Sequence, residues 1–167
     1  MRRALCVGID EYGFGPLTGC VNDAQRMMAV LEKQQDGSPN FECKTLLAPQ
    51  GAPNTVVTRA ILRDHLQRLF KDPADVALFH FSGHGTINNL DGYLVTQDAK
   101  KYDEGVPMSD VLKLANDSRA KEVVILLDCC FSGLVLSGQG KRKPLAKRRV
   151  GAPPNCILQG QSKDKRG

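Results

Sequence analysis

Residues 122–133 read EVVILLDCCFSG, and this stretch decides how the rest of the chain is interpreted. The aliphatic and β-branched run at 123–127 is typical of a strand covered on both faces in a parallel sheet. The run stops at Asp128, and Cys129 and Cys130 follow directly. Because open α/β sheets bind ligands at the carboxyl ends of their strands, these side chains are candidates for a reactive site.

A second apolar run, DVALFHF at 75–81, ends in the same way, in SGHG at 82–85. Adjacent strands lie about 4.8 Å apart, so His84 and Cys130 come within reach of each other if the two strands are neighbours. A thiol is a strong nucleophile, and an imidazole can take its proton. In the alternative interpretation, which the spacing leaves open, the imidazole sits in a Gly-rich turn and the thiol packs as a small hydrophobe.

The remaining apolar periodicity predicts that strands and helices alternate along the chain. Strands are expected at 4–9, 41–47, 76–81 and 123–127, and helices at 21–31, 57–70 and 108–115. Between them, residues 86–105 are polar, with only a hairpin-like segment at 93–95. This order predicts an α/β fold with a mostly parallel sheet and helices on both faces.

Length and composition narrow the class of protein. A chain of 167 residues is long enough for one ordinary domain. We expect a cytoplasmic protein without a membrane partner, because no signal peptide or membrane-spanning window is present. The six cysteines lack paired C-x-x-C spacing, so they are expected to be free thiols rather than disulfides or metal ligands.

The net charge of +5 comes from the end of the chain. Residues 141–167 hold nine basic residues and one acidic residue, whereas residues 1–140 hold 14 basic and 17 acidic residues. We expect one domain over 1–137 and a basic, disordered linker or tail over 138–167. A solvated charge run is one alternative interpretation of these basic residues, and because no aromatic residues are interleaved with them, nucleic acid is not an expected partner.

Four short motifs, taken together and in this order, match a known family. They are GID at 8–10, GCVNDA at 19–24, FSGHG at 81–85 and DCCFSG at 128–133. The set resembles the caspase-like cysteine peptidases (peptidase C14-type), most closely the metacaspase and bacterial caspase-homologue branch. The resemblance covers residues 4 to about 135 and corresponds to the large-subunit portion.

The resemblance implies a caspase-like (caspase-hemoglobinase) fold, a three-layer α-β-α sandwich, and a cysteine-type endopeptidase. It implies Cys130 as nucleophile and His84 as acid/base, because the family pattern D-x-C-x-S-G puts Cys129 at the variable position. The backbone N–H groups of Gly85 and Cys130 would form the oxyanion hole.

The resemblance also implies a pocket for the first substrate side chain, lined by Cys20, Asp23, Ser82 and Asp128. Two carboxylates in one pocket favour a Lys or Arg side chain, so we expect cleavage after basic residues. The basic runs at 141–143 and 147–149 follow the nucleophile, and we expect self-cleavage there. Asp10 lies near the same edge, and both a turn role and a pocket role stay open for it.

Beyond residue 133 no pattern predicts the further strands that complete this family's fold, so we expect the fold to be incomplete at its C-terminal side. The expected partners are a polypeptide substrate and a separate small-subunit segment. One alternative is a catalytically incomplete regulatory or partner-binding module. Another is a redox or metal protein that uses Cys129 and Cys130.

A Cys-His dyad requires no cofactor, and no metal ligands are assigned. Some metacaspases need Ca²⁺, and four acids of the polar segment carry suitable oxygen atoms. They are Asp91, Asp98, Asp103 and Glu104. Their spacing fits no calcium-binding loop, so we interpret them as solvated loop acids and keep Ca²⁺ as an alternative.

Overall fold

The computed structural model describes residues 1–129 and the backbone of residues 156–160. The predicted nucleophile Cys130 and the two basic runs lie outside the described residues. The expected domain boundary at residue 137 also falls there, so that boundary stays a prediction.

The four strands and three helices that the apolar pattern predicts all form, in the predicted order, and among the described residues four further strands join them. They are β1 (Arg2–Ile9), α1 (Cys20–Glu32), β2 (Phe41–Ala48), α2 (Arg59–Lys71), β3 (Ala74–Ser82), β4 (Gly85–Ile87), β5 (Gly92–Lys100), β6 (Asp103–Pro107), α3 (Met108–Asn116), β7 (Ala120–Asp128) and β8 (Cys156–Gly160). None of these helices is both long enough and apolar enough to cross a membrane.

The main sheet has the order β2-β1-β3-β7-β8, and all of its pairs are parallel. Strands β3 and β7 are therefore neighbours, as the proposed approach of the two chemical motifs requires. In this register Ser82 pairs with Asp128, at the carboxyl end of both strands. The end of β3 leads to His84, and the end of β7 leads to the predicted nucleophile.

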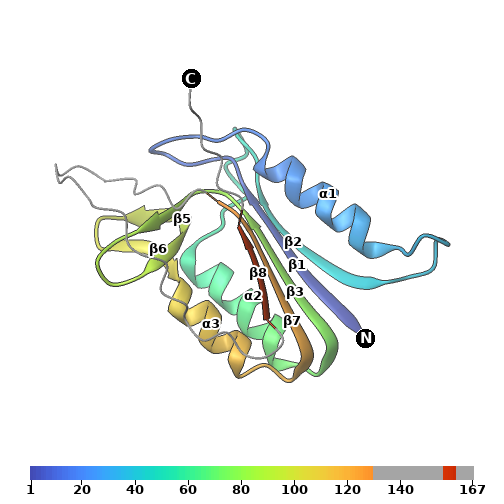
Figure 1. The fold of residues 1–167 in the computed structure, drawn as a ribbon. Helices are drawn as coiled ribbons and strands as arrows, with labels where there is room; N and C mark the ends of the chain where they lie inside the picture. Colours follow the sequence, from blue (N-terminus) through green and yellow to red (C-terminus); the bar gives the residue numbers. More distant parts are fainter. Residues whose placement is uncertain (130–155, 161–167) are drawn as a thin grey trace.

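Helices cover the sheet on both faces (Figure 1): α1 lies on one face, and α2 and α3 lie on the other. The core lies on the α2 side, where odd-numbered residues of β1 and β3 such as Val7 and Phe79 pack against Leu66 and Phe70 of α2. Burying one such side chain contributes roughly 1.5–3 kcal/mol to folding. The predicted α/β sandwich with a mostly parallel sheet is confirmed.

Helix α1 packs very closely against β1 at Gly8. A Cβ atom at this position would lie 2.4 Å from the carbonyl oxygen of Cys20 and 2.9 Å from the Cβ of Ala24. Gly8 pairs in register with Ser82 of β3. The first turn of α1 is therefore held over the sheet next to Ser82.

Asp10 fixes the start of the same helix. Its carboxylate accepts hydrogen bonds from the backbone N–H of Cys20 at 2.8 Å and of Val21 at 3.4 Å. The residue before the helix, Gly19, has a φ of 104°, a conformation that glycine adopts without strain. Asp10 therefore stabilises the first turn of α1, a role that was not among the two considered, and a role in the pocket stays open because its carboxylate also acts on the Cys20 thiol.

Two segments differ from the sequence-based expectation. The sequence predicts only a hairpin-like stretch at 93–95 in the polar segment after β3, but this segment forms the antiparallel sheet β4-β5-β6. The expectation of no further strand after residue 133 is also wrong, because β8 pairs in parallel with β7, from Val123↔Cys156 to Leu127↔Gly160. The strands β4, β5 and β6 pair with one another, and β8 pairs with the distant strand β7, so these strands depend on pairing rather than on a long apolar run.

Candidate active site

The turn that carries His84 is fixed by Tyr12, from the loop between β1 and α1. The backbone N–H of His84 donates to the Tyr12 hydroxyl at 3.1 Å, and this hydroxyl donates to the Val95 carbonyl of β5 at 3.1 Å. Val95 in turn donates its N–H to the His84 carbonyl at 3.0 Å. The close approach requires Gly83, where a Cβ atom would lie 2.6 Å from the Tyr12 hydroxyl.

The imidazole of His84 is oriented by the same loop. Its Nε2 lies 2.7 Å from the carbonyl oxygen of Gly15, and its ring lies against Tyr12 and Phe14, with centroid distances of 4.7 Å and 5.7 Å. A carbonyl oxygen only accepts hydrogen bonds, so Nε2 carries the proton in this arrangement. In the neutral ring, Nδ1 is then the nitrogen able to accept a proton.

The turn before His84 is also joined to the end of β7. The backbone N–H of Gly83 donates to the carbonyl of Asp128 at 3.5 Å. The next residue, Cys129, is buried and directly precedes the predicted nucleophile. Burial raises the pKa of the Tyr12 hydroxyl, and the hydrogen bond from the His84 N–H lowers it.

Cys20 and Ser82 meet where α1 lies over the end of β3. A side-chain hydrogen bond joins them. Burial is the main cause that raises the pKa of the Cys20 thiol to about 11, and the Ser82 hydrogen bond opposes this rise. At neutral pH Cys20 is therefore an uncharged thiol, which suits a residue that lines a pocket better than a nucleophile.

The two acids predicted for the pocket come from different elements and face the same region. Asp23 is exposed on the first turn of α1, and Asp128 is exposed at the end of β7. Both carboxylates act electrostatically on His80 of β3, two residues before Ser82 on the same strand. The structure thus brings Cys20, Ser82 and both acids to the α1 face of the sheet, while their roles in substrate binding remain a proposal.

Sequence reasoning missed two residues of this region, Tyr12 and His80. Tyr12 lies 72 positions from His84, and nothing in its Gly-rich loop indicates such a contact. His80 stands inside the apolar run of β3, and this histidine among aliphatic side chains was the available signal. Gly85, proposed for the oxyanion hole, begins β4 and pairs with Leu94.

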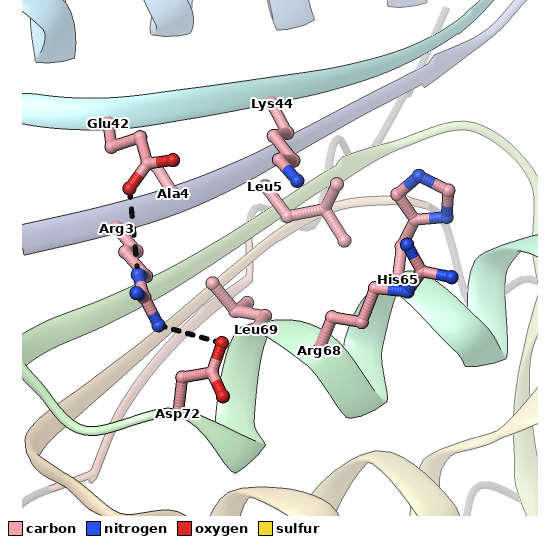
Figure 2. Close-up of a pocket in the computed structure, with 9 residues that line it drawn as sticks. All are labelled: Arg3, Ala4, Leu5, Glu42, Lys44, His65, Arg68, Leu69 and Asp72. Atoms are coloured by element: carbon pink, nitrogen blue, oxygen red, sulfur yellow. Dashed lines mark ion pairs between the residues drawn. The ribbon is translucent and has the colours of Figure 1, made fainter.

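A separate cavity lies away from these residues, between α2 and strands β1 and β2 (Figure 2). Its wall includes Arg3, whose guanidinium lies 3.6 Å from Glu42 and 3.1 Å from Asp72. The full lining consists of Arg3, Ala4, Leu5, Glu42, Lys44, His65, Arg68, Leu69 and Asp72. None of the predicted site residues contributes to it.

Three of the four acids considered as calcium ligands are engaged in other contacts. Asp98 accepts hydrogen bonds from the backbone of Arg59 and the hydroxyl of Thr96, and Asp103 forms an ion pair with Arg59. Asp91 accepts from the backbone of Ser109. Within residues 1–129 no three His, Cys, Asp or Glu side chains are grouped to hold a metal ion. These acids do not fit a shared ion, and a calcium requirement stays a prediction.

Comparison with known families identifies the fold. The sequence model of the caspase domain matches residues 1–165. The chain belongs to the caspase domain family. This confirms the resemblance drawn from the four motifs. It also accounts for the two neighbouring strands β3 and β7, of which the first leads to the His84 turn and the second to Cys129 and Cys130.

Curated relatives of this caspase domain are metacaspases. Metacaspase-2 of Trypanosoma brucei brucei is 36% identical over 154 residues, covering 80% of this chain and 42% of the relative. Metacaspase-1A of Aspergillus fumigatus is 36% identical over 152 residues, covering 81% of this chain and 36% of the relative. The chain therefore spans about two fifths of the length of these relatives.

Proposed function

We propose that this caspase domain belongs to a cysteine endopeptidase that hydrolyses peptide bonds after Arg or Lys, with Cys130 and His84 as its dyad. The observation that carries the proposal is the fixed orientation of His84. Gly15 holds Nε2, Tyr12 holds the backbone, and Nδ1 is left to accept a proton. The imidazole lies at the carboxyl end of β3, beside the strand that leads to Cys130.

The proposed reaction uses the imidazole of His84 alternately as base and acid. Nδ1 of His84 accepts the thiol proton of Cys130, and the thiolate attacks the carbonyl carbon of the substrate. The resulting oxyanion accepts hydrogen bonds from the backbone N–H groups of Gly85 and Cys130. The imidazolium then gives its proton to the leaving amine, and water hydrolyses the thioester with His84 as general base.

The proposed specificity comes from the two carboxylates above β3. Asp23 and Asp128 are exposed, so a guanidinium or ammonium group can reach both, while Cys20 and Ser82 supply a neutral lining. Like charges in one pocket attract a basic side chain and disfavour an acidic one. The basic runs at 141–143 and 147–149 carry the same type of side chain, and we propose self-cleavage there.

A fluorogenic peptide with Arg before the scissile bond tests the activity on the full chain. We expect hydrolysis by the wild-type protein and by Cys129→Ala, and its loss in Cys130→Ala and His84→Ala. Asp23→Asn and Asp128→Asn are expected to raise KM for the Arg peptide with a smaller effect on kcat. Hydrolysis by Cys130→Ala at the wild-type rate would refute the dyad.

A second candidate function is a caspase-like module that binds basic polypeptides without hydrolysing them. It is favoured by the exposure of Asp23 and Asp128, because two exposed acids bind a basic side chain whether or not a nucleophile follows. Peptide binding that depends on both acids, with no Cys130-dependent turnover, identifies this function. The small-subunit partner and the cytoplasmic location also stay proposals.

A further inference from the structure

His80 is a buried histidine directly below the region where the two acids meet. Its side chain is 4% exposed, and its Nδ1 has no hydrogen-bond partner within the described part of the chain. His80 pairs in register with Cys6 of β1 and Leu126 of β7. It lies two residues before Ser82 on the same strand, so both side chains point to the α1 face of the sheet.

The charges that reach His80 come from two other elements. Asp23 lies on the first turn of α1, Asp128 lies at the end of β7 in register with Ser82, and both carboxylates act electrostatically on His80. The thiols nearby are uncharged at neutral pH: burial raises the pKa of Cys6 on β1 to about 12 and that of Cys20 on α1 to about 11. The electrostatic surroundings of His80 are therefore set by the two carboxylates.

Two influences on the protonation of His80 oppose each other. Burial lowers its pKa below the ordinary value, because a charged imidazole loses its hydration, while Asp128 and Asp23 favour the charged form. A cation bound between the carboxylates would cancel their effect on His80 and leave burial as the remaining influence, which favours the neutral imidazole. A bound basic side chain and a proton on His80 therefore compete for the same negative charge.

We propose that His80 is a specificity-determining residue that acts through Asp23 and Asp128, and that its protonation weakens binding of Arg and Lys side chains. The inference rests on the proposed function of these acids. With His80 neutral, both carboxylates are free to bind a guanidinium group. With His80 protonated, the imidazolium holds part of their charge, and the coupling is reciprocal, so substrate binding expels the proton.

The test is the pH dependence of KM and kcat for the fluorogenic Arg peptide, measured on the full chain. Between about pH 7.5 and about pH 5 we expect the wild-type KM to rise several-fold, and the rise should begin only below about pH 6.5, because burial lowers the pKa of His80. In His80→Gln we expect KM to change less than about twofold over this range. The kcat profile, which the dyad determines, is expected to be the same in both proteins.

The control variant is His65→Gln, which removes a histidine on α2, on the opposite face of the sheet. It is expected to keep the wild-type KM profile. His80→Gln also keeps both acids, so any contribution from their own titration appears in both profiles. A KM rise in His80→Gln equal to that of the wild-type protein would overturn the proposal.

Benzamidine, an amidinium compound, tests the pocket without turnover. By calorimetry on Cys130→Ala, we expect its affinity to fall with acidification and to become insensitive to pH when His80→Gln is added. His80→Asn serves if His80→Gln fails to show a cooperative unfolding transition. A lack of peptide hydrolysis then refutes only the peptidase proposal, whereas benzamidine affinity with the same pH dependence in both proteins refutes the role of His80.

Discussion

The hydroxyl of Tyr12 accepts a hydrogen bond from the backbone N–H of His84, at 3.1 Å. The same hydroxyl donates to Val95, so one side chain ties the loop before α1 to the turn after β3 and to β5. The Tyr12 side chain is fully buried, with 2% exposure. The position of the proposed acid/base is thus set by a residue outside every motif that identifies the family.

Tyr12→Phe is expected to destabilise the fold and to slow hydrolysis. The substitution leaves the part-buried N–H of His84 and the buried carbonyl of Val95 without this hydroxyl, which costs about 1–3 kcal/mol. Urea unfolding measures the stability, and kcat for the Arg peptide measures the activity. Tyr102→Phe, at a tyrosine that is 84% exposed, is the matched control and should change neither. Equal stability of the two variants would contradict the role of Tyr12.

Gly83→Ala is expected to destabilise the same turn, because it adds an atom where the turn lies against Tyr12. The added Cβ would lie 2.6 Å from the Tyr12 hydroxyl and 3.1 Å from the ring of Phe81. Overpacking of this kind costs about 1–3 kcal/mol. Gly13→Ala is the control, because nothing lies within 4 Å of the Cβ that it adds. The two midpoints of thermal unfolding should separate, and coincident midpoints would show that the turn adapts.

The α/β order was predictable because long apolar runs determine which segments are buried. The apolar run of β7, Val123 to Leu127, and the run of β3 are long enough to indicate strands covered on both faces. The sheet β4-β5-β6 was not predictable in the same way. Its first strand, Gly85–Ile87, has three residues, and Gly105 in β6 has a φ of 141° and lies against Leu94.

The motifs predicted which residues lie together at the site. They did not predict the contacts that hold those residues in place. Ser82 and Asp128 pair in register, and Cys20 forms a side-chain hydrogen bond with Ser82, as expected of residues that line one pocket. The contacts of Tyr12 and His80 join segments far apart in the chain. Such contacts follow from strand register and helix packing, which no local pattern encodes.

Asp10→Ala is expected to loosen the first turn of α1. It removes the acceptor for the N–H groups of Cys20 and Val21, and losing such a cap costs about 1 kcal/mol. Asp36→Ala, in an exposed turn, is the comparison. If Asp10 positions the pocket, KM for the Arg peptide should rise in Asp10→Ala and not in Asp36→Ala. An unchanged KM in both variants would show that Asp10 stabilises the helix without positioning the pocket.

Thiol reactivity provides a prediction that does not depend on turnover. Because burial raises the pKa of Cys6 to about 12 and of Cys20 to about 11, both thiols should react slowly with iodoacetamide at neutral pH. Peptide mass spectrometry should find Cys130 labelled first. Labelling in denaturant provides the control, since all cysteines are then accessible. Faster labelling of Cys20 than of Cys130 would contradict the assignment of the nucleophile.

The stability of the domain should depend on pH through His80. Its pKa is lowered in the folded state, chiefly by burial, so below about pH 6.5 the unfolded chain binds more protons than the folded one. The contribution of His80 to stability is therefore complete above that pH and decreases as pH falls towards the folded-state pKa. Urea unfolding of wild-type and His80→Gln proteins from about pH 7.5 to about pH 5 should give a smaller decrease in the variant. Parallel curves would show that His80 does not titrate on unfolding.

The contact at Gly8 has a consequence for tolerance to mutation. A substitution there cannot be absorbed by a flexible side chain, since the atoms nearest to its Cβ, after the carbonyl of Cys20, are the Cα of Val21 and the Cβ of Ala24. When single positions of β1 are randomised and folded variants are selected, we expect to recover only glycine at position 8, whereas the neighbouring positions accept other aliphatic residues. Substitution by any larger residue would push α1 away from β1 and so separate the acid on α1, Asp23, from the strands beneath it.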